Sequence, residues 1–276
     1  MRLHLLASGS AGNCIFVEAG GTRILIDCGI SGAEAARRLE KAGSRPEDIE
    51  AIVVSHEHSD HLQGVGVLAR RFGLPVYLTA GTQGACNGQL GSPVEVRPFV
   101  PGREFMIGDL MIRPFSIPHD AAEPVAFTLH HGGVKAGVAT DLGFSTALAR
   151  QHLSGSHLLV LESNHDPGML ARSSYPWELK RRIRGRSGHL SNQDAARLLE
   201  GVLHDELETV ALAHLSERNN CPELALKEAG AVLEKYRLGE RVTVEVAGQN
   251  DVLSLSAGTQ EGVPTESGLF DLEEKR

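Results

Sequence analysis

Residues 56 to 61 read His-Glu-His-Ser-Asp-His and come directly after the apolar stretch from Ile49 to Ser55. That stretch has the length and the β-branched content of a buried strand, so the cluster lies where the strand ends. A solvated polar turn accounts for one or two histidines at such a place. It accounts poorly for three histidines and two carboxylates within six residues. The density and the position together predict metal binding.

The spacing HxHxDH predicts two metal positions rather than one. On the turn after a strand, His56 and His58 can point to one side, while Asp60 and His61 can point to a neighbouring position. Divalent metals of borderline softness accept imidazole and carboxylate ligands. The pattern therefore predicts two divalent metal ions as cofactors, either Zn²⁺ or Mn²⁺.

The remaining pattern predicts a layered α/β fold. Strands are expected at 2–8, 13–20, 22–29, 49–55 and 75–80, and helices at 33–43 and 62–73, the second ending at Gly73. Residues 93–162 are mostly β, and later helices at 192–204, capped by Ser191, and 222–237 accompany strands at 208–216 and 241–248. Two sheets covered by helices satisfy this order. It predicts one α/β sandwich and not a doubly wound parallel sheet.

The chain of 276 residues is long enough to bury a sizeable core, and no linker divides it. We expect one domain over residues 1–256, followed by a polar tail without periodicity at 257–276 that is mobile. The four cysteines form no CxxC pair, and no segment is apolar enough to span a membrane. These features predict a cytoplasmic protein that does not act at a membrane. The oligomeric state stays open.

The cluster and its surroundings resemble the metallo-β-lactamase fold superfamily, whose hallmark is HxHxDH after a strand. Further matches follow in the family's order: Asp27 in ILIDCG, His119 in SIPHD, Asp141 in VATDLG and His214 in VALAHLS. The resemblance covers roughly residues 1 to 250 and implies a four-layer αββα sandwich. The shorter motifs ASGSAGNC, ESNHD, SGHLS and HLSERNN resemble the YycJ/WalJ branch, which is associated with 5′→3′ exonuclease action on double-stranded DNA.

The resemblance also implies a ligand set. His56, His58 and His119 would hold one metal, Asp60, His61 and His214 would hold the other, and Asp141 would bridge them. Asp27 would lie behind the ligands and orient them. Two metals about 3.5–4 Å apart share a water whose pKa falls to about 7, so hydroxide is available at neutral pH. This chemistry predicts hydrolysis, with Asp60 among the catalytic residues, and leaves the substrate open.

The basic run at 180–186 is the feature that favours a phosphodiester substrate. Lys180, Arg181, Arg182, Arg184 and Arg186 put five positive charges into seven residues of a protein whose net charge is −8. The run leads into Ser187-Gly188-His189, which resembles a motif of RNase J-type nucleases in which the histidine contacts the scissile phosphate. We predict His189 as a catalytic residue, and phosphate contacts from this set: Ser10, Asn13, His165, Arg182, Arg184, Arg186, Ser187 and His189.

Three functions remain open on the sequence. The first is a metal-dependent phosphodiesterase, in particular a DNA exonuclease that holds DNA through its backbone with little sequence specificity. Aromatic residues make up only 4% of the chain, and no base-stacking platform is evident. The second is a thioester or lactone hydrolase of a small metabolite, which the acidic net charge favours. The third, a regulatory protein without activity, conflicts with the presence of all seven predicted ligands.

Overall fold

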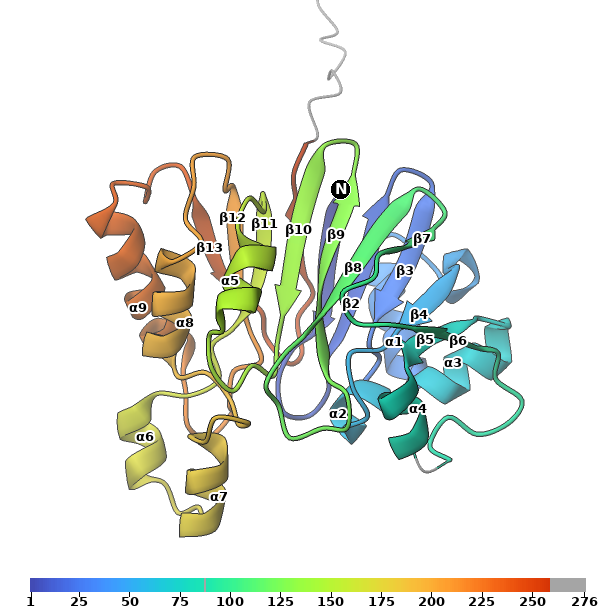
Figure 1. Cartoon of the computed structure of the whole chain (residues 1–276), viewed down its shortest axis with the longest axis horizontal. Coiled ribbons are helices and arrows are strands. Elements are labelled where there is room, and N and C mark those ends of the chain that lie inside the picture. Colours follow the sequence, from blue (N-terminus) through green and yellow to red (C-terminus); the bar gives the residue numbers. More distant parts are fainter. Residues whose placement is uncertain (87, 259–276) are drawn as a thin grey trace, which may run out of the picture.

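The computed structural model describes residues 1–86 and 88–258, and within them two β-sheets are packed face to face and covered by helices on both outer sides (Figure 1). This is the predicted αββα sandwich. The mobile tail predicted from residue 257 lies, from residue 259 onward, outside the described residues. Ala257 itself is buried, and its backbone nitrogen donates to the carbonyl of Met1. The folded part therefore continues at least to this residue.

The first sheet contains the N-terminal strands. In spatial order it consists of β14 (Leu253–Ser256), β1 (Arg2–Ala7), β2 (Cys14–Ala19), β3 (Thr22–Ile26), β4 (Ala51–Val53), β5 (Val76–Thr79) and β6 (Val96–Phe99). The pairs β3–β4, β4–β5 and β5–β6 are parallel, whereas β14, β1, β2 and β3 pair antiparallel. The strand β14 was not predicted, and it places the end of the described chain beside its beginning.

The second sheet also combines parallel and antiparallel pairs. Its order is β13 (Thr243–Val246), β12 (Thr209–Ala213), β11 (Leu158–Glu162), β10 (Val134–Ala139), β9 (Val125–His131), β8 (Leu110–Ser116) and β7 (Phe105–Ile107). The pairs β10–β11, β11–β12 and β12–β13 are parallel. In each sheet, parallel strands therefore bring their carboxyl ends to a common edge, which is where ligands bind in such sheets.

The helices form the outer layers. The first sheet is covered by α1 (Gly32–Lys41) and α3 (Val65–Phe72), with α2 (Ser59–Leu62), α4 (Ala80–Ala85) and the short turn η1 (Pro46–Asp48) beside them. The second sheet is covered by α5 (Ala147–Leu153), α8 (Asn192–Glu200) and α9 (Pro222–Lys235). The remaining helices, α6 (Pro167–Arg172) and α7 (Trp177–Ile183), project beyond the sheets at the end where α2 lies (Figure 1).

Local sequence signals account for the helix ends. The Ser191 side chain accepts a hydrogen bond from the Asp194 backbone nitrogen at the start of α8, as predicted. Gly73 ends α3 in the left-handed conformation, with φ of 67°, which a glycine adopts without steric cost. Both predicted boundaries are confirmed.

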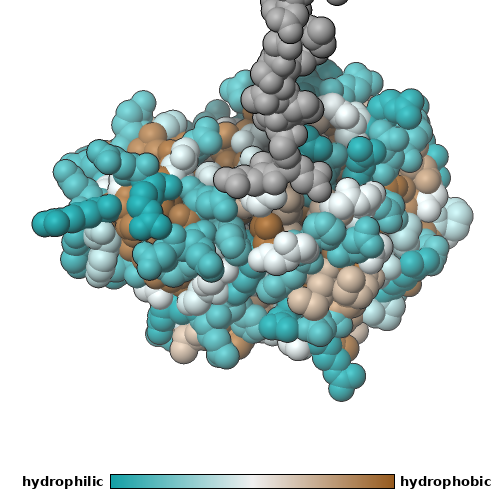
Figure 2. Space-filling view, turned by 90° about the horizontal axis from the view of Figure 1, so that it is seen from above, coloured by the Kyte–Doolittle hydropathy of each residue, from teal (hydrophilic) through white to brown (hydrophobic). Residues whose placement is uncertain are grey.

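Three apolar clusters hold the layers together. One lies between the sheets, one between the first sheet and its helices, and one between the second sheet and its helices. Viewed from the end opposite α2 and α7, the surface is mostly hydrophilic, and hydrophobic residues form small separate groups (Figure 2). Among the described residues, no helix combines the length and the apolar character that a membrane crossing requires.

Candidate metal centre

The candidate site lies where strands of both sheets end. Three of its residues lie just beyond the ends of strands and adopt left-handed backbone conformations: Asp27 after β3, Asp141 two residues after β10, and His214 after β12, with φ of 57°, 57° and 56°. Residues other than glycine rarely adopt this conformation, and it concentrates at functional sites. At each position the turn sends a polar side chain into the space between the sheet edges.

The first group of candidate ligands consists of His56, His58 and His119. His56 Nε2 lies 3.1 Å from His58 Nδ1, and His119 Nε2 lies 3.3 Å from the same His58 atom. One ring nitrogen from each residue lies within 4.8 Å of the other two, a spacing that allows all three to bind one ion. His56 and His119 are buried, and His58 is partly exposed toward the cleft.

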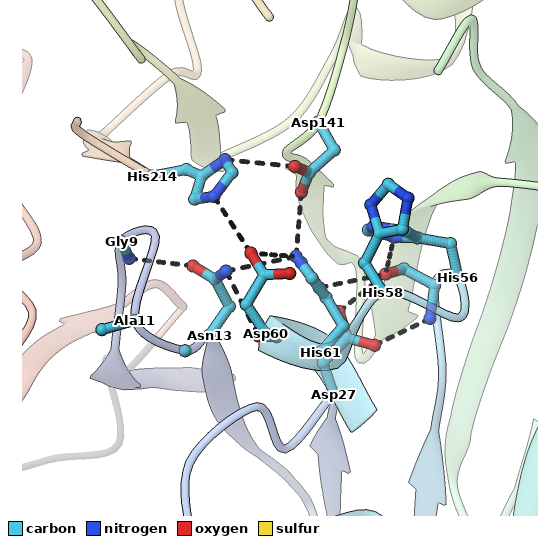
Figure 3. A network of polar contacts seen from close by, with 12 residues as sticks. Gly9, Ala11, Asn13, Asp27, His56, His58, Asp60, His61, Asp141 and His214 are labelled. Carbon is cyan, nitrogen blue, oxygen red and sulfur yellow. Dashed lines mark hydrogen bonds and ion pairs between the residues drawn. The ribbon is translucent and has the colours of Figure 1, made fainter. Parts of the chain in front are cut away.

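The second group consists of Asp60, His61 and His214. Asp60 Oδ2 lies 3.7 Å from His61 Nε2 and 3.6 Å from His214 Nε2. Asp141 lies between the two groups, with one oxygen 3.1 Å from His61 Nε2 (Figure 3). Its other oxygen lies 3.9 Å from His119 Nε2. The structure therefore brings together all seven ligands that the sequence predicts.

The histidines of the cluster are oriented by partners behind them. The Asp27 carboxylate lies 2.8 Å from His61 Nδ1, the Glu162 carboxylate 3.1 Å from His214 Nδ1, and the Gly188 carbonyl oxygen 3.2 Å from His119 Nδ1. For His56 the partner is the Ser55 hydroxyl, 2.9 Å from Nδ1.

In each of these four rings, Nδ1 is occupied by a protein group and Nε2 faces the cluster. Such partners select the tautomer whose Nε2 lone pair is free for a metal.

The donor set fits two divalent cations. Asp141 Oδ2 and His214 Nε2 are buried, and neither makes a hydrogen bond of normal geometry among the described residues, because the polar atoms close to them belong to other candidate ligands. Buried polar atoms without such hydrogen bonds are rare, and several that converge indicate a binding site for an ion or a water molecule. Five imidazoles and two carboxylates in groups of three are typical ligands of Zn²⁺ and also accept Mn²⁺.

The proton affinities of the cluster support the same conclusion. Burial lowers the pKa of His56 well below its usual value, and His61 lowers it further. Burial acts in the same direction on His61 and His214, but Asp141 and the neighbouring carboxylates outweigh it. They raise the pKa of His61 well above its usual range and that of His214 to about 10. A cation placed among these carboxylates takes over the role of the bound protons.

His189 lies beside the cluster and faces a pocket. Its Nδ1 is 2.7 Å from Glu162 Oε1 and 3.6 Å from Asp141 Oδ1, and its side chain is 22% exposed. Burial disfavours the charged ring, but Glu162 outweighs this effect and raises the pKa of His189. The same Glu162 oxygen therefore positions both His189 and the ligand candidate His214.

The pocket above the cluster has a volume of about 410 Å³. Its floor contains ligand candidates from both groups, and its walls include residues of α7 and of the turn before it. Of the predicted phosphate contacts, Ser10, Arg182 and His189 line it. Arg182 pairs with Asp120, which also lies 3.4 Å from His119 Nε2.

Other predicted phosphate contacts are not brought to this surface. Asn13 is buried, and its amide nitrogen lies 3.1 Å from His61 Nε2 while its oxygen accepts from the Gly9 backbone (Figure 3). His165 is buried outside the pocket wall. Arg184 and Ser187 are exposed but do not line the pocket, and the Arg186 guanidinium lies over the Phe144 ring, 4.0 Å from its centroid. Asn13 therefore shapes the loop next to the ligands instead of facing a substrate.

Sequence reasoning missed three contributors and understated a fourth. Ser55, which joins Asp27 to His56, and Asp120, which pairs with Arg182, were not assigned a role. Tyr175, a pocket wall residue, carried no signal beyond its proximity to the basic run. Glu162 belongs to the motif ESNHD, whose sequence is compatible with lining the metal site or with a polar turn, whereas the structure shows that it is fully buried and contacts two histidines. A sequence motif shows where such a residue lies in the chain, but it does not show which distant side chains the residue contacts.

Comparison with known proteins identifies relatives. Residues 22–214 match the model of the beta-lactamase superfamily domain. The chain is 38% identical over 250 residues to the exodeoxyribonuclease YycJ of Bacillus anthracis, covering 89% of this chain and 95% of the relative. It is 35% identical to the exodeoxyribonuclease WalJ of Streptococcus pneumoniae serotype 2, covering 89% and 93%. The crystal structure of the metallo-beta-lactamase fold protein YhfI from Bacillus subtilis superposes with a TM-score of 0.70 at 18% identity, covering 92% and 98%, and shows the shared fold alone.

Proposed function

The chain belongs to the beta-lactamase superfamily, in the branch of the YycJ and WalJ exodeoxyribonucleases, and from this premise we propose that it is a binuclear enzyme that degrades double-stranded DNA from its 5′ ends. The family and the candidate ligand groups support a metal-dependent nuclease. The number of metals, the preference for duplex DNA and the polarity are the proposal. We also propose that residues 1–256 form a single catalytic domain and that the protein is cytoplasmic.

The ligands divide between two positions in this proposal. His56, His58 and His119 would hold one metal, Asp60, His61 and His214 the other, and Asp141 would contact both. Bound there, two divalent ions would supply hydroxide at neutral pH and would neutralise charge on the phosphate oxygens. The chain's own task is to hold the ligands, admit one phosphodiester and supply a proton to the leaving oxygen.

The position of His189 supports a role as the proton donor. Glu162 holds its Nδ1, so its Nε2 side is the one that remains for the pocket. An imidazolium held in this way can bind a non-bridging phosphate oxygen and can protonate the oxygen that leaves. Since His119 Nδ1 contacts the carbonyl of Gly188, a movement of the His189 segment also affects the first ligand group.

Arg182 and Ser10 provide the polar walls around this centre. Arg182 lies on α7 and is 60% exposed, and Ser10 is an exposed residue of the loop between β1 and β2. Arginine binds phosphate oxygens through two parallel hydrogen bonds, which suits a chain of phosphodiesters. Its pairing with Asp120 keeps it at the mouth of the pocket in the free enzyme.

The observation that carries the proposal is the joint placement of seven ligand candidates beneath a pocket that His189 and Arg182 line. A hydrolase of a thioester or lactone remains the second candidate, because a pocket of about 410 Å³ also fits a small metabolite. Arg182 and His189 favour a phosphate-containing substrate over such a neutral one.

The test is a hydrolysis assay on stripped protein with each metal added back. Blunt duplexes carry a 5′ phosphate and a label at either end, and bis-p-nitrophenyl phosphate and a thioester serve as alternative substrates. We expect early release of the 5′ label as mononucleotide and gradual shortening of 3′-labelled strands. His58→Ala should abolish this, whereas His131→Ala, a partly exposed histidine outside the cluster, should not. Cleavage of the thioester without cleavage of either phosphodiester would support the second candidate instead.

A further inference from the structure

The size of the pocket imposes a condition on a duplex substrate. A volume of about 410 Å³ fits a ligand of the size of a nucleotide and excludes a base-paired helix. The metal ligands form the floor of this pocket, so the terminal phosphodiester reaches them only after its base has left the stack. If the proposed function holds, some element at the mouth of the pocket must keep the two strands apart.

Helix α7 stands at that mouth and has two distinct faces. Leu179, Arg182 and Ile183 are three and four residues apart, so they lie on one side of the helix, and all three line the pocket. Trp177, Arg181 and Arg184 are spaced by four and three residues and lie on the opposite side. All three are exposed and none lines the pocket.

The outer face is unusual for this protein. Trp177 is 66% exposed. No other large hydrophobic residue in the described part of the chain is more exposed. Within residues 1–86 and 88–258, neither Arg181 nor Arg184 makes an ion pair, whereas Arg182 on the pocket side of the helix pairs with Asp120. An exposed indole beside unpaired guanidinium groups matches a strand of nucleic acid, which offers both bases and phosphates.

At the start of α7, one aromatic residue lies on the pocket side and another lies on the outer side. Tyr175 lines the pocket, Pro176 follows it, and Trp177 lies on the outer side. The Arg218 guanidinium lies 5.9 Å from the centre of the Tyr175 ring, which holds the ring on the pocket side. One aromatic side chain therefore stands on each side of the helix at its start.

Hydrogen bonds and an ion pair fix α7 to neighbouring segments. The Lys180 side chain donates to the Ala171 carbonyl of α6, and the backbone nitrogen of His189 donates to the Ile183 carbonyl. Arg182 joins the helix to Asp120, next to the ligand candidate His119. The contacts of Arg182 and Ile183 connect α7 to the residues around the cluster, the contact of Lys180 fixes it to α6, and Trp177 and Arg181 remain exposed.

We infer that α7 separates the strands of the duplex: the cleaved strand passes Tyr175 into the pocket, and the complementary strand is held on the outer face by Trp177 and Arg181. This inference rests on the proposed function. Trp177 stacks on the base that loses its partner, which favours the opened end. Only a duplex requires this face, because a single strand enters the pocket without it.

The test compares hydrolysis of three substrates by the metal-loaded protein: a blunt duplex, the single strand alone, and a duplex whose 5′ end is frayed by mismatches. We expect Trp177→Ala to lower the ratio of duplex to single-strand rates roughly tenfold, the order expected from loss of one base–aromatic stack. Arg181→Ala should lower the same ratio. Fraying the 5′ end should restore the ratio for both variants, and Trp177→Phe should keep most of it. Tyr175→Ala should slow both substrates.

Tyr236→Ala is the matched control, because Tyr236 is 48% exposed at the far end of α9 and does not line the pocket. Thermal unfolding and metal content of all variants check that the fold is intact. An unchanged ratio for Trp177→Ala, or equal losses on duplex and single strand, overturns the inference while the proposed function stands. A wild-type protein that cleaves single strands but not duplexes also overturns it. Failure of the wild type on every DNA substrate overturns both.

Discussion

Replacing Asp27 by asparagine should weaken one metal position more than the other. Asp27 is buried and accepts three hydrogen bonds, from the Ser55 nitrogen at 2.8 Å, from the Ser55 hydroxyl at 2.7 Å and from His61 Nδ1 at 2.8 Å. Asparagine keeps the shape but turns one of the two oxygens into a donor. If that donor faces His61, the imidazole accepts at Nδ1 and carries its proton on Nε2, the atom that faces the cluster.

The expected loss follows from the role of such partners. Removing the group behind a ligating histidine lowers metal affinity roughly 10–100-fold, which is about 1.4–2.7 kcal/mol. The loss should be larger at the position of Asp60, His61 and His214, because Asp27 contacts His61 directly and reaches His56 only through the Ser55 hydroxyl. Stepwise titration of stripped protein against a chelator of known affinity measures the two binding events separately.

A matched control separates this effect from general destabilisation. Glu18 also lies against a buried histidine, with 3.3 Å between its carboxylate and His4 Nε2, and neither residue belongs to the cluster. Glu18→Gln should lower the unfolding temperature without changing either metal affinity. The reasoning is refuted if Asp27→Asn weakens both positions equally or neither of them.

Four further outcomes are expected. Protein purified without chelator should contain two divalent metals per chain by elemental analysis, and His61→Ala should retain one and lose activity by orders of magnitude. Chelation should lower the unfolding temperature, since a ligand at about 100 times its Kd stabilises the folded state by about 2.7 kcal/mol, and calorimetry with and without metal measures the difference. Replacing Arg182 and Arg184 together should flatten the slope of log K against log salt for duplex binding by roughly 0.9 per lost phosphate contact, and the metal content should not change. If the salt dependence is unaltered, the basic residues at 180–186 form only a solvated helix face. His189→Ala should slow DNA turnover on the order of 100-fold or more with little change in that slope, which single-turnover kinetics at several salt concentrations can measure.

Much of the fold was predictable because its signals are local. Periodicity placed the strands and the covering helices, Ser191 marked the start of α8, and Gly73 marked the end of α3. Each of these signals acts within one or two turns of chain, so a single sequence is sufficient to recognise it. The short helices α4, α5 and α6 and the edge strand β7 were missed because their patterns are too brief to show a period.

The two-sheet order itself depends on long-range pairing. Leu253–Ser256 becomes a strand because it pairs with Arg2–Leu5, about 250 positions earlier in the chain. Its own four residues carry no signal that distinguishes it from a loop. The αββα arrangement was reached through the resemblance of the motifs, and the pattern of elements was consistent with it without requiring it.

The sequence by itself determined the identity and order of the candidate ligands, since His56, His58, Asp60 and His61 lie within one turn after a strand. Only the tertiary structure decided which groups orient them. Glu162 contacts His189 and His214, which are 27 and 52 positions away, and Asp27 contacts His61 across 34 positions. It also decided that Asn13 is buried against His61 and that α7 presents Arg182 to the pocket and Arg181 to solvent. The physical reason is that ligand type follows from side-chain chemistry, whereas orientation and exposure depend on which distant strands and helices pack together.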